Sequence, residues 1–377
     1  MYSSLEKRNL IILGGSGFFG QQFVAIGREK YNLAVVDAAT PSLPFPDVPV
    51  VQGDLSNDEG AYHAIESARG KLPERRVDAL INLAAKVSYL SSHDELYAAN
   101  VKTARNSALN AARLNAVFLH MGAIASQGHV QGLITEEHPL AAVEPYGETK
   151  AEAERELHQL ANGTKFCHLV FRSTVPIGPG LERSINNAIF ETALGPIVPY
   201  RGTKSTYVAT EDIARAFFFA FENYDALAKP AKTIADRAYN VGTAEGIADK
   251  EMFLHLAKMI QGPEAQRLTI PTPYVMALAA GWVTEQFYRT AKALGIDLPP
   301  PPLVTGIAKL TKTGHEQDQS KFEHDFGRLG FKLKYKSGKD VLNLGLVHKL
   351  NADWHGRIEP TIAIRRFARR HHLKLRN

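Results

Sequence analysis

The segment Leu10–Gly20 restricts the possible folds of this chain more than any other stretch. It begins with the apolar run Leu10–Leu13, which is typical of a strand buried on both faces. Glycines follow at positions 14, 15, 17 and 20, and a helical pattern then runs from Gly20 to Lys30. A strand, a glycine-rich turn and a helix in this order predict the opening unit of an α/β fold.

The glycine spacing also predicts what this turn binds. Gly14, Gly17 and Gly20 give G-x-x-G-x-x-G, and the overlapping set from Gly15 gives G-x-G-x-x-G. One glycine makes the tight turn out of the strand, Gly17 leaves the backbone open to close approach, and Gly20 lets the helix pack on the sheet. A pyrophosphate would then lie on free N–H groups at the positive end of the helix. We therefore expect a dinucleotide at this turn.

An acidic residue, Asp37, follows the second predicted strand, Leu33–Val36. A carboxylate at this point accepts hydrogen bonds from both ribose hydroxyls of NAD and repels the 2′-phosphate of NADP. The sequence therefore favours NAD as the cofactor. An exposed turn aspartate is the alternative interpretation of Asp37.

Apolar runs alternate with helical patterns from Leu10 to Val241. Further helices are predicted at Asn100–Leu114 and Tyr146–Leu160. Further strands are predicted at Val48–Val51, Ala79–Leu83, Val117–Met121, His168–Arg172 and Ala238–Val241. Continuous apolar runs are expected where helices cover both faces of a parallel sheet. The predicted fold class is α/β, with a doubly wound parallel Rossmann sheet.

The chain is longer than one typical compact domain, because it has 377 residues. We therefore expect a smaller, mostly helical C-terminal substrate lobe beside the sheet. The pattern loosens after Gly178, and the prolines of Pro299–Pro302 separate a helix from later material. We assign residues 1–177 and 205–242 to the NAD-binding domain, 178–204 and 243–360 to the substrate-binding lobe, and 361–377 to a basic tail.

The composition is that of an ordinary soluble protein, with 45% hydrophobic and 22% charged residues. The single cysteine, Cys167, excludes an internal disulfide, and we expect it to be buried in a strand. The histidines lack metal-ligand spacing, so no metal is assigned. The sequence shows no secretory signal and no apolar run of membrane length, so the expected location is cytoplasmic.

The positive charge of the chain is concentrated in its C-terminal tail. Six basic residues and no acidic residue lie in Arg365–Asn377, which leaves −1 of the net charge of +5 for the rest of the chain. A basic tail is weak evidence for nucleic acid, and none is expected as a partner. Apolar residues between the arginines favour a peripheral contact with anionic lipid, and a solvated tail is the competing interpretation.

Eight short motifs resemble, in order, those of the extended short-chain dehydrogenases/reductases, also called the NAD-dependent epimerase/dehydratase family. After the glycine loop they are Gly53–Leu55, Asn82–Ala85, Asn100–Val101, Pro145–Lys150, Arg172–Gly180, Tyr207–Asp212 and Tyr239–Gly242. The resemblance covers Asn9 to Gly242 clearly, and it implies an NAD-dependent enzyme. With the glycine loop, the expected cofactor contacts are Gly14, Gly17, Phe18, Phe19, Gly20, Asp37, Asp54, Leu55, Leu83, Ala84, Ala85, Asn100, Tyr146, Lys150 and Val175.

The resemblance implies that Tyr146 and Lys150 are the catalytic Tyr-x-x-x-Lys pair. Four residues apart on a helix, the two side chains share one face. Tyrosine, with a pKa of about 10, is a poor base at neutral pH. A lysine cation and an oxidised nicotinamide nearby would lower that pKa. Tyr146 would then take a proton from an alcohol, or donate one to a carbonyl in reverse. Lys150 is also expected to hold the nicotinamide ribose.

One position departs from the family pattern. A serine or threonine usually ends the fifth strand and binds the substrate oxygen beside the tyrosine, but Ala123 stands there. The candidate replacement donors are Ser126, Ser88, a backbone N–H of the Gly122–Ala123 turn, or an ordered water.

Several features bear on the substrate. Val175 and Ser205 stand where sugar-nucleotide enzymes of the family tend to carry an asparagine and an arginine. The distal segments Pro273–Trp282 and His315–Lys336 resemble the hydroxysteroid and sterol dehydrogenase branch. The sequence predicts an apolar substrate pocket, with packing of the lobe as the alternative, from the side chains of Leu278, Trp282, Phe287 and Tyr288.

The leading hypothesis is an NAD-dependent oxidoreductase that interconverts a hydroxyl and a ketone on an apolar, sterol-like or β-hydroxy acid-like substrate. One alternative is a sugar-nucleotide epimerase or dehydratase, which Val175 and Ser205 disfavour. Another is a catalytically impaired NAD-binding scaffold or regulator, which Ala123 suggests. The expected partners are a small apolar substrate, a membrane surface at the tail, and a second copy of the chain.

Overall fold

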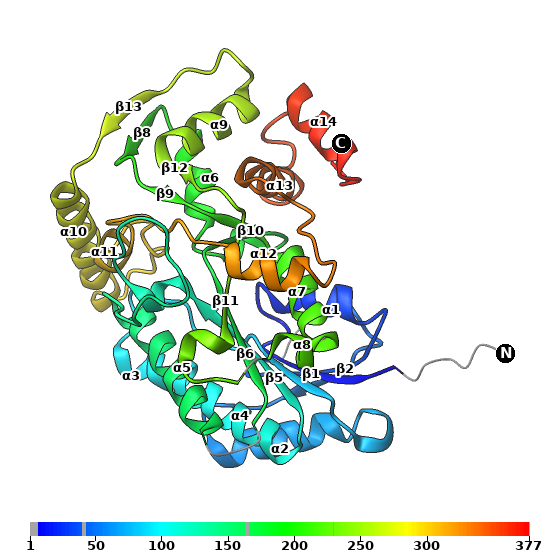
Figure 1. Cartoon of the computed structure of the whole chain (residues 1–377). Helices are drawn as coiled ribbons and strands as arrows, with labels where there is room; N and C mark the ends of the chain where they lie inside the picture. The colour runs from blue at the N-terminus through cyan, green and yellow to red at the C-terminus, as the bar shows by residue number, and fades with distance from the viewer. Residues whose placement is uncertain (1–6, 40–42, 163–165, 229, 377) are drawn as a thin grey trace.

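The computed structural model describes residues 7–39, 43–162, 166–228 and 230–376. Within these residues, seven strands form one parallel sheet in the order β11-β6-β5-β4-β1-β2-β3 (Figure 1). They are β1 (Asn9–Leu13), β2 (Asn32–Asp37), β3 (Val50–Gln52), β4 (Ala79–Asn82), β5 (Val117–Ala123), β6 (His168–Ser173) and β11 (Ala238–Val241). The predicted α/β fold is confirmed. The strand order reverses between β1 and β4, and parallel sheets bind ligands at the carboxyl ends of such a switch point.

Helices cover both faces of the sheet. One layer has α1 (Gly20–Gly27), α7 (Thr210–Glu222) and α12 (Ser320–Gly327), whose phenylalanines pack together against β1 and β6. The other layer has α2 (Asp58–Arg69), α4 (Thr103–Arg113) and α5 (Pro145–Ala161), which pack mainly through alanines and leucines. With both faces covered, every residue of β1 is buried.

Short elements connect these layers. The helix α3 (His93–Leu96) and a π-helical turn, Tyr97–Lys102, precede α4, and α8 (Tyr224–Leu227) follows α7. Single 3₁₀ turns span Pro73–Arg75, Ile124–Gln127, Leu181–Arg183 and Ile234–Arg237.

The C-terminal lobe has its own hydrophobic core, built around Phe190, Leu256 and Leu346. Three strand pairs lie at the edge of this lobe: β7 (Val175–Ile177) with β10 (Tyr207–Ala209), β9 (Lys204–Ser205) with β12 (Ile247–Ala248), and β8 (Ile197–Tyr200) with β13 (Leu268–Pro271). Its main helices are α6 (Asn187–Leu194), α9 (Asp249–Gln261), α13 (Gly338–Asn351) and α14 (Ile362–Arg370).

The structure corrects two expectations from the sequence. Cys167 was expected to be buried in a strand, but it is exposed and lies one residue before β6, which begins at His168. The basic tail contains α14, whose Ile364 and Phe367 are buried in the core of the C-terminal lobe. The tail is therefore docked on the lobe, and its apolar side chains are largely used in packing.

Two of the four side chains expected in an apolar pocket, Trp282 and Phe287, do not lie in one, whereas Leu278 and Tyr288 are half-buried. Helix α10 (Tyr274–Ala293) and the short α11 (Thr305–Leu310) lie along one edge of the molecule, far from α14 (Figure 1). Trp282 and Phe287 are exposed on the outside of α10, so they neither line a pocket nor pack the lobe. Within the described residues, no helix is long and apolar enough to cross a membrane.

Candidate active site

The glycines of the loop after β1 differ in what surrounds them. Gly14 has φ +78°, and a Cβ there would lie 2.7 Å from the backbone of Ala84. A Cβ on Gly20 would lie 2.3 Å from the carbonyl oxygen of Gly14. Gly17 is exposed, and a Cβ on it would have the Gly14 oxygen as its nearest atom, at 3.4 Å. Gly14 and Gly20 are therefore required by the fold, whereas Gly17 leaves open space in front of the backbone.

The start of α1 fits a pyrophosphate group. No side chain caps this helix. Among the described residues, the backbone N–H groups of Phe18 and Phe19 have no hydrogen-bond partner. Free N–H groups at the positive end of a helix bind phosphate oxygens. The expected contacts of Gly17, Phe18 and Phe19 are therefore compatible with the local backbone.

Asp37 ends β2 beside this loop. Its Oδ2 accepts a hydrogen bond of 3.0 Å from the backbone N–H of Ser16, and its side chain remains half-buried. This contact fixes the carboxylate next to the glycine loop, where an NAD ribose would lie.

Asp54 and Leu55 follow β3, at the same carboxyl-end edge of the sheet as the glycine loop and Asp37. Asp54 is exposed, and its Oδ1 accepts hydrogen bonds from the backbone N–H and hydroxyl of Ser56 at 2.9 and 2.7 Å. Leu55 is buried, and its carbonyl accepts a hydrogen bond of 3.1 Å from Asn106. A hollow of about 300 Å³ adjoins this pair, lined in part by Ser56 and Tyr97. The family resemblance implies that the aspartate of this motif, Asp54, meets the adenine ring of the cofactor, and its exposed position beside the hollow is compatible with that contact.

A buried pair that the sequence analysis missed supports the turn after β4. Asn82 Oδ1 accepts a hydrogen bond of 3.1 Å from the backbone N–H of Ala84, and Asn82 Nδ2 lies 3.1 Å from His120 Nδ1. Burial, and then the charge of Lys150, holds the pKa of His120 well below its usual value, so its neutral ring accepts that hydrogen bond. The pair holds the backbone of Leu83–Ala85 along the proposed cofactor path. His120 faces Asn82 in the register of β5 with β4, which only the sheet reveals.

Asn100 acts on the loop after β4 from the π-helical turn. Its Oδ1 accepts from the backbone N–H of Lys86 at 2.7 Å, and its Nδ2 donates to the Lys86 carbonyl at 3.2 Å. The same Nδ2 donates to the Thr149 hydroxyl at 3.0 Å. Asn100 therefore ties this loop to α5 one residue before Lys150, which is a positioning role.

Helix α5 begins with Glu144, Pro145 and Tyr146. The two oxygens of Glu144 accept the backbone N–H groups of Tyr146 and Gly147 at 2.8 and 2.6 Å. Burial raises the pKa of Glu144 to about 7. This cap fixes the first turn of the helix and so the direction of the Tyr146 side chain. Glu144 was not singled out from the sequence, because a glutamate is an unusual N-cap.

Tyr146 and Lys150 share the face of α5 that packs on β5. The Lys150 Nζ donates a hydrogen bond of 2.5 Å to the Met121 carbonyl. Burial lowers the pKa of Lys150 to about 8. Burial, and then the Glu144 carboxylate, raises the pKa of Tyr146, which differs from the lowering expected from the sequence. The reason is that the lysine cation is directed at a backbone carbonyl while the phenol is enclosed.

The surroundings of Tyr146 are apolar. Its ring packs with Leu96, Ala123 and Leu310, and with the ring of Tyr89, whose centroid lies 5.8 Å away. Tyr89 was missed because only the fold brings the loop after β4 against α5. Burial, and then Glu144 and Tyr146, raises the pKa of Tyr89.

The expected replacement donors differ in availability. The Ser126 hydroxyl is fully buried and donates to the Ala123 carbonyl at 2.8 Å, so its hydrogen is already used. The Ser88 hydroxyl accepts the backbone N–H groups of Leu90 and Ser91 at 3.2 and 3.1 Å.

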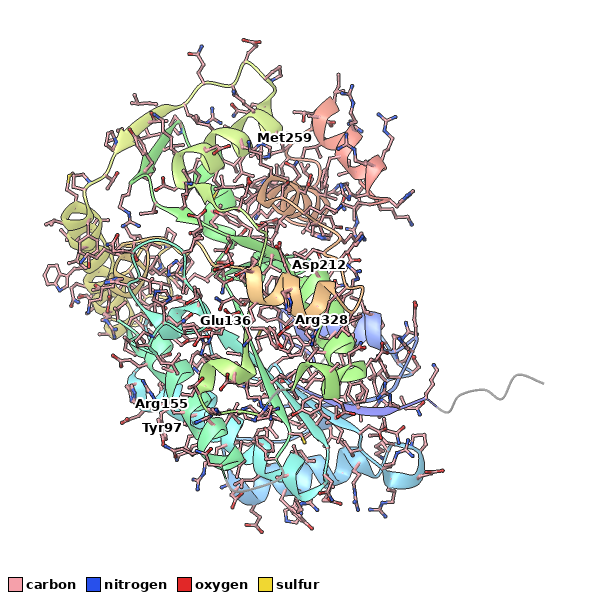
Figure 2. The ribbon with its side chains drawn as sticks, viewed as in Figure 1. Tyr97, Glu136, Arg155, Asp212, Met259 and Arg328 are labelled. Atoms are coloured by element: carbon pink, nitrogen blue, oxygen red, sulfur yellow. The ribbon has the colours of Figure 1, made fainter. Side chains whose placement is uncertain are left out.

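A buried ion pair supports α5 behind the active side chains. Arg172 on β6 donates to Glu154 from Nε and Nη2 at 2.9 and 2.7 Å, and from Nη1 to the Glu136 carbonyl at 3.0 Å. Glu136 also accepts the backbone N–H of Asn240 at 2.7 Å, and Figure 2 shows it near the middle of the molecule. Glu154 lies one turn after Lys150, so this network fixes α5 against the sheet.

The two residues that bear on the substrate class lie on short strands at the edge of the C-terminal lobe. Val175 begins β7 and packs against the core of that lobe. Ser205 lies in β9, opposite Ile247 and beside His315.

An arginine and two histidines lie near this strand pair. Arg201 Nη2 donates to the Thr311 carbonyl, and His129 Nε2 lies against the Lys309 carbonyl, each at 2.7 Å. His315 is buried, and its Nε2 has no hydrogen-bond partner among the described residues. Burial, and then the charges of His129 and Arg201, lowers the pKa of His315 to about 4. These three side chains surround residues 309–315, which also include Leu310 of the Tyr146 cluster.

The fold is similar to those of several solved enzymes. The Bordetella bronchiseptica enzyme WbmG in complex with NAD and UDP has 18% identity and a TM-score of 0.67, over 94% of this chain and 97% of that one. The Campylobacter jejuni UDP-Glc/GlcNAc 4-epimerase has 17% identity and a TM-score of 0.65, over 93% and 99%. The dTDP-glucose 4,6-dehydratase of Bacillus anthracis in complex with NAD has 17% identity and a TM-score of 0.64, over 93% and 99%. None of the three belongs by name to a sterol branch.

The sequence gives the family directly. No curated protein sequence matches the chain. The model of the NAD dependent epimerase/dehydratase family matches residues 10–242, which contain the glycine loop, Asp37, Tyr146 and Lys150. The chain therefore belongs to the NAD-dependent epimerase/dehydratase family, and NAD is its cofactor.

Proposed function

We propose that the chain catalyses NAD-dependent hydride transfer at a secondary alcohol or ketone, with Tyr146 as the acid/base. The observation that carries this proposal is the arrangement on α5, in which a Glu144 cap fixes Tyr146 beside the end of β5 and Lys150 lies one turn further. Gly14, Gly17, Phe18, Phe19, Gly20 and Asp37 would hold the phosphate and ribose end of the cofactor. The division into an NAD-binding domain (1–177 and 205–242), a substrate lobe (178–204 and 243–360) and a tail (361–377) belongs to the same proposal.

The side chains support the following chemistry. The cofactor, held by the glycine loop and Asp37, would supply a hydride acceptor for the alcohol carbon or, in its reduced form, a hydride donor for the ketone. The raised pKa of Tyr146 keeps the phenol protonated, so it is ready to donate to a carbonyl oxygen. In the opposite direction, the Tyr146 phenolate would accept the alcohol proton, and the Lys150 cation would stabilise that phenolate only after turning away from the Met121 carbonyl that it contacts here. The apolar walls of Leu96 and Leu310 exclude water from this transfer.

Tyr89 is proposed as the second hydroxyl that holds the substrate oxygen. It packs edge-on against Tyr146 and in the same cluster as Ala123, whose methyl group stands where the family usually has a hydroxyl. One donor directed at a developing oxyanion is worth about 10²–10³-fold in rate. Tyr89→Phe should lower kcat by that order. Adding Ala123→Ser to this variant should restore much of the loss. An unchanged rate in Tyr89→Phe would exclude Tyr89 and leave a backbone N–H or a water as the donor.

A nucleotide-linked sugar is the proposed substrate class. Three similar structures are named as sugar-nucleotide enzymes or contain UDP. The group of Arg201, His129 and His315 next to Leu310 offers positive charge and an unpaired buried nitrogen to a diphosphate. This support outweighs the absence of an asparagine at Val175 and of an arginine at Ser205.

An apolar alcohol is the second candidate substrate. The apolar surroundings of Tyr146 favour it, because Leu96, Ala123, Leu310 and the Tyr89 ring offer few groups that bind sugar hydroxyls. Calorimetry on the NAD-loaded protein separates the candidates. UDP should bind, and Arg201→Gln should weaken it at least tenfold, whereas the exposed Arg289→Gln should not. If the chain does not bind UDP or UDP-sugars but turns over an apolar alcohol, the apolar alcohol becomes the first candidate substrate and the nucleotide-linked sugar the second.

The catalytic proposal is tested with Tyr146→Phe. The ring stays and only the hydroxyl is removed, so kcat should fall by about 10²–10⁴-fold while NADH fluorescence titration gives an unchanged Kd. If Tyr146→Phe leaves an identified activity intact, Tyr146 is not the acid/base and the scaffold hypothesis gains support.

The tail and the assembly are separate proposals. Arg365, Arg366, Arg369 and Arg370 are exposed on α14, so the tail is proposed to make an electrostatic contact with anionic lipid, without insertion. A homodimer is tested by sedimentation of the whole chain.

A further inference from the structure

The outer side of α10 carries the largest group of exposed apolar side chains among the described residues. Val275, Trp282 and Phe287 expose 72%, 57% and 68% of their surface. We call the following set the α10 outer face: Val275, Met276, Ala279, Ala280, Trp282, Val283, Phe287 and Ala293. Large apolar surfaces of this kind usually mark an interaction site.

The outer face forms one continuous stripe along the helix. At about 100° per residue, the exposed uncharged positions of α10 fall within one arc of roughly 160°. Only Gln286 and Thr290 are polar in that arc. An ordinary surface helix has its polar residues on the outside, so α10 has the reverse pattern.

The inner side of α10 is covered by residues 303–305. Gly281 lies against residue 304, where an added Cβ would come within 2.8 Å of the Val304 backbone. Thr284 donates to the Leu303 carbonyl at 2.5 Å, and Glu285 accepts the backbone N–H of Thr305 at 3.3 Å. Only the outer face therefore remains available to a partner.

The charges beside the outer face are basic. Arg289 and Lys292 are exposed on one flank of the helix. The acidic residue of α10, Glu285, is half-buried and paired with Arg289 at 2.8 Å. Lys312 lies over the ring of Tyr274 at the start of the helix, 5.2 Å from its centroid. An apolar face with two exposed aromatic side chains and one basic flank is complementary to an anionic lipid surface.

We propose that the α10 outer face binds in the interfacial layer of an anionic membrane leaflet, with the helix lying flat on the surface. The helix has 20 residues, so it is about 30 Å long and roughly 10 Å wide. A protein partner has to present a surface of matching shape. A lipid layer needs neither a minimum area nor a complementary shape.

This surface is distinct from the basic tail. Figure 1 shows α10 and α14 on opposite edges of the molecule, so one flat bilayer does not contact both.

The outer face is also connected to the candidate active site. Directly behind α10, Gly306 of α11 lies against Tyr89, and Leu310 packs in the Tyr146 cluster.

The test uses the full chain and vesicles of phosphatidylcholine with and without phosphatidylglycerol. The wild-type chain should sediment with the anionic vesicles, and Trp282→Ser/Phe287→Ser should weaken this at least tenfold with unchanged thermal stability. Trp282→Phe keeps an apolar aromatic group and should still bind. Brominated lipid should quench the fluorescence of the wild-type chain through Trp282 but not that of Trp282→Phe, because Trp354 is buried in the lobe.

The matched control changes the tail instead. Arg366→Gln/Arg370→Gln removes two exposed charges of α14 and should leave vesicle binding by α10 intact. The proposal is overturned if no vesicle binds, or if only the tail variant loses binding. It is also overturned if sedimentation shows a dimer that Trp282→Ser/Phe287→Ser converts to a monomer.

Discussion

The central sheet and α10 place their apolar side chains in opposite settings. In β1 every side chain is buried between two layers of helices. In α10, only Ala277, Gly281 and Ala291 are buried, and five large apolar side chains are exposed: Val275, Met276, Trp282, Val283 and Phe287. The same residue types therefore stabilise the fold in one region and leave a surface in the other. Apolar content alone does not distinguish a core from an interface.

The largest expected effect compares two phenylalanines. Phe326 on α12 is 0% exposed and Phe287 on α10 is 68% exposed. Phe326→Ala should lower the free energy of unfolding by about 3–5 kcal/mol, because it leaves a cavity among packed rings. Phe287→Ala should change it by less than about 0.5 kcal/mol. Urea denaturation of both variants checks this. Equal losses would show that the outer face of α10 is packed in solution.

A second pair separates folding from cofactor binding within the glycine loop. Gly20→Val should prevent stable folding, because its side chain would meet the Gly14 carbonyl. Gly17→Val has open space, so its unfolding free energy should stay within about 0.5 kcal/mol of wild type, while NAD affinity falls at least tenfold. Circular dichroism and fluorescence titration measure the two properties. Unchanged NAD binding in Gly17→Val would mean that the pyrophosphate lies elsewhere.

A third prediction concerns the choice of cofactor. The Asp37 carboxylate is held beside the loop by the Ser16 backbone N–H, where it would repel a 2′-phosphate. NADH should bind at least tenfold more tightly than NADPH, a difference of about 1.4 kcal/mol. Asp37→Asn should reduce the ratio of the NADPH dissociation constant to the NADH dissociation constant. Equal affinities in the wild-type chain would remove Asp37 from the cofactor site.

The smallest expected effect is a pH dependence at Lys150. Its pKa is lowered to about 8, so the cation is lost as pH rises past that value, and kcat should decline there. The unfolded lysine still binds its proton between about 8 and 10.4, so its contribution to stability increases with pH over that window. Lys150→Arg should shift the decline of kcat to higher pH. A flat profile to pH 10 would contradict a catalytic charge at this position.

Much of the cofactor half follows from local sequence. The glycine spacing, the buried runs and Asp37 each specify a backbone turn or a strand end within a few residues. The predicted strands agree with the observed ones to within about two residues at each end, and β3 is the one that begins later than predicted. Such features depend on φ/ψ preferences and on side-chain alternation, which are properties of short segments.

Most side chains that contact Tyr146 could be identified only from the folded structure. Tyr89 and Leu310 reach Tyr146 from two segments that are distant in the chain, and no local pattern marks their contact. The same holds for the ion pair between Arg172 and Glu154, which connects β6 to α5. Their pKa shifts follow from burial, which depends on the complete packing.

By itself, the sequence determined the α/β class, the dinucleotide turn, the family and the Tyr-x-x-x-Lys pair. Only the tertiary structure decided that Ser126 is already bonded, that the tail is docked, and that Trp282 and Phe287 lie outside. The physical reason is that a helix with apolar residues on several sides can bury any of them. Which side faces inward depends on the segments that pack against it, and here residues 303–305 take the side of Gly281.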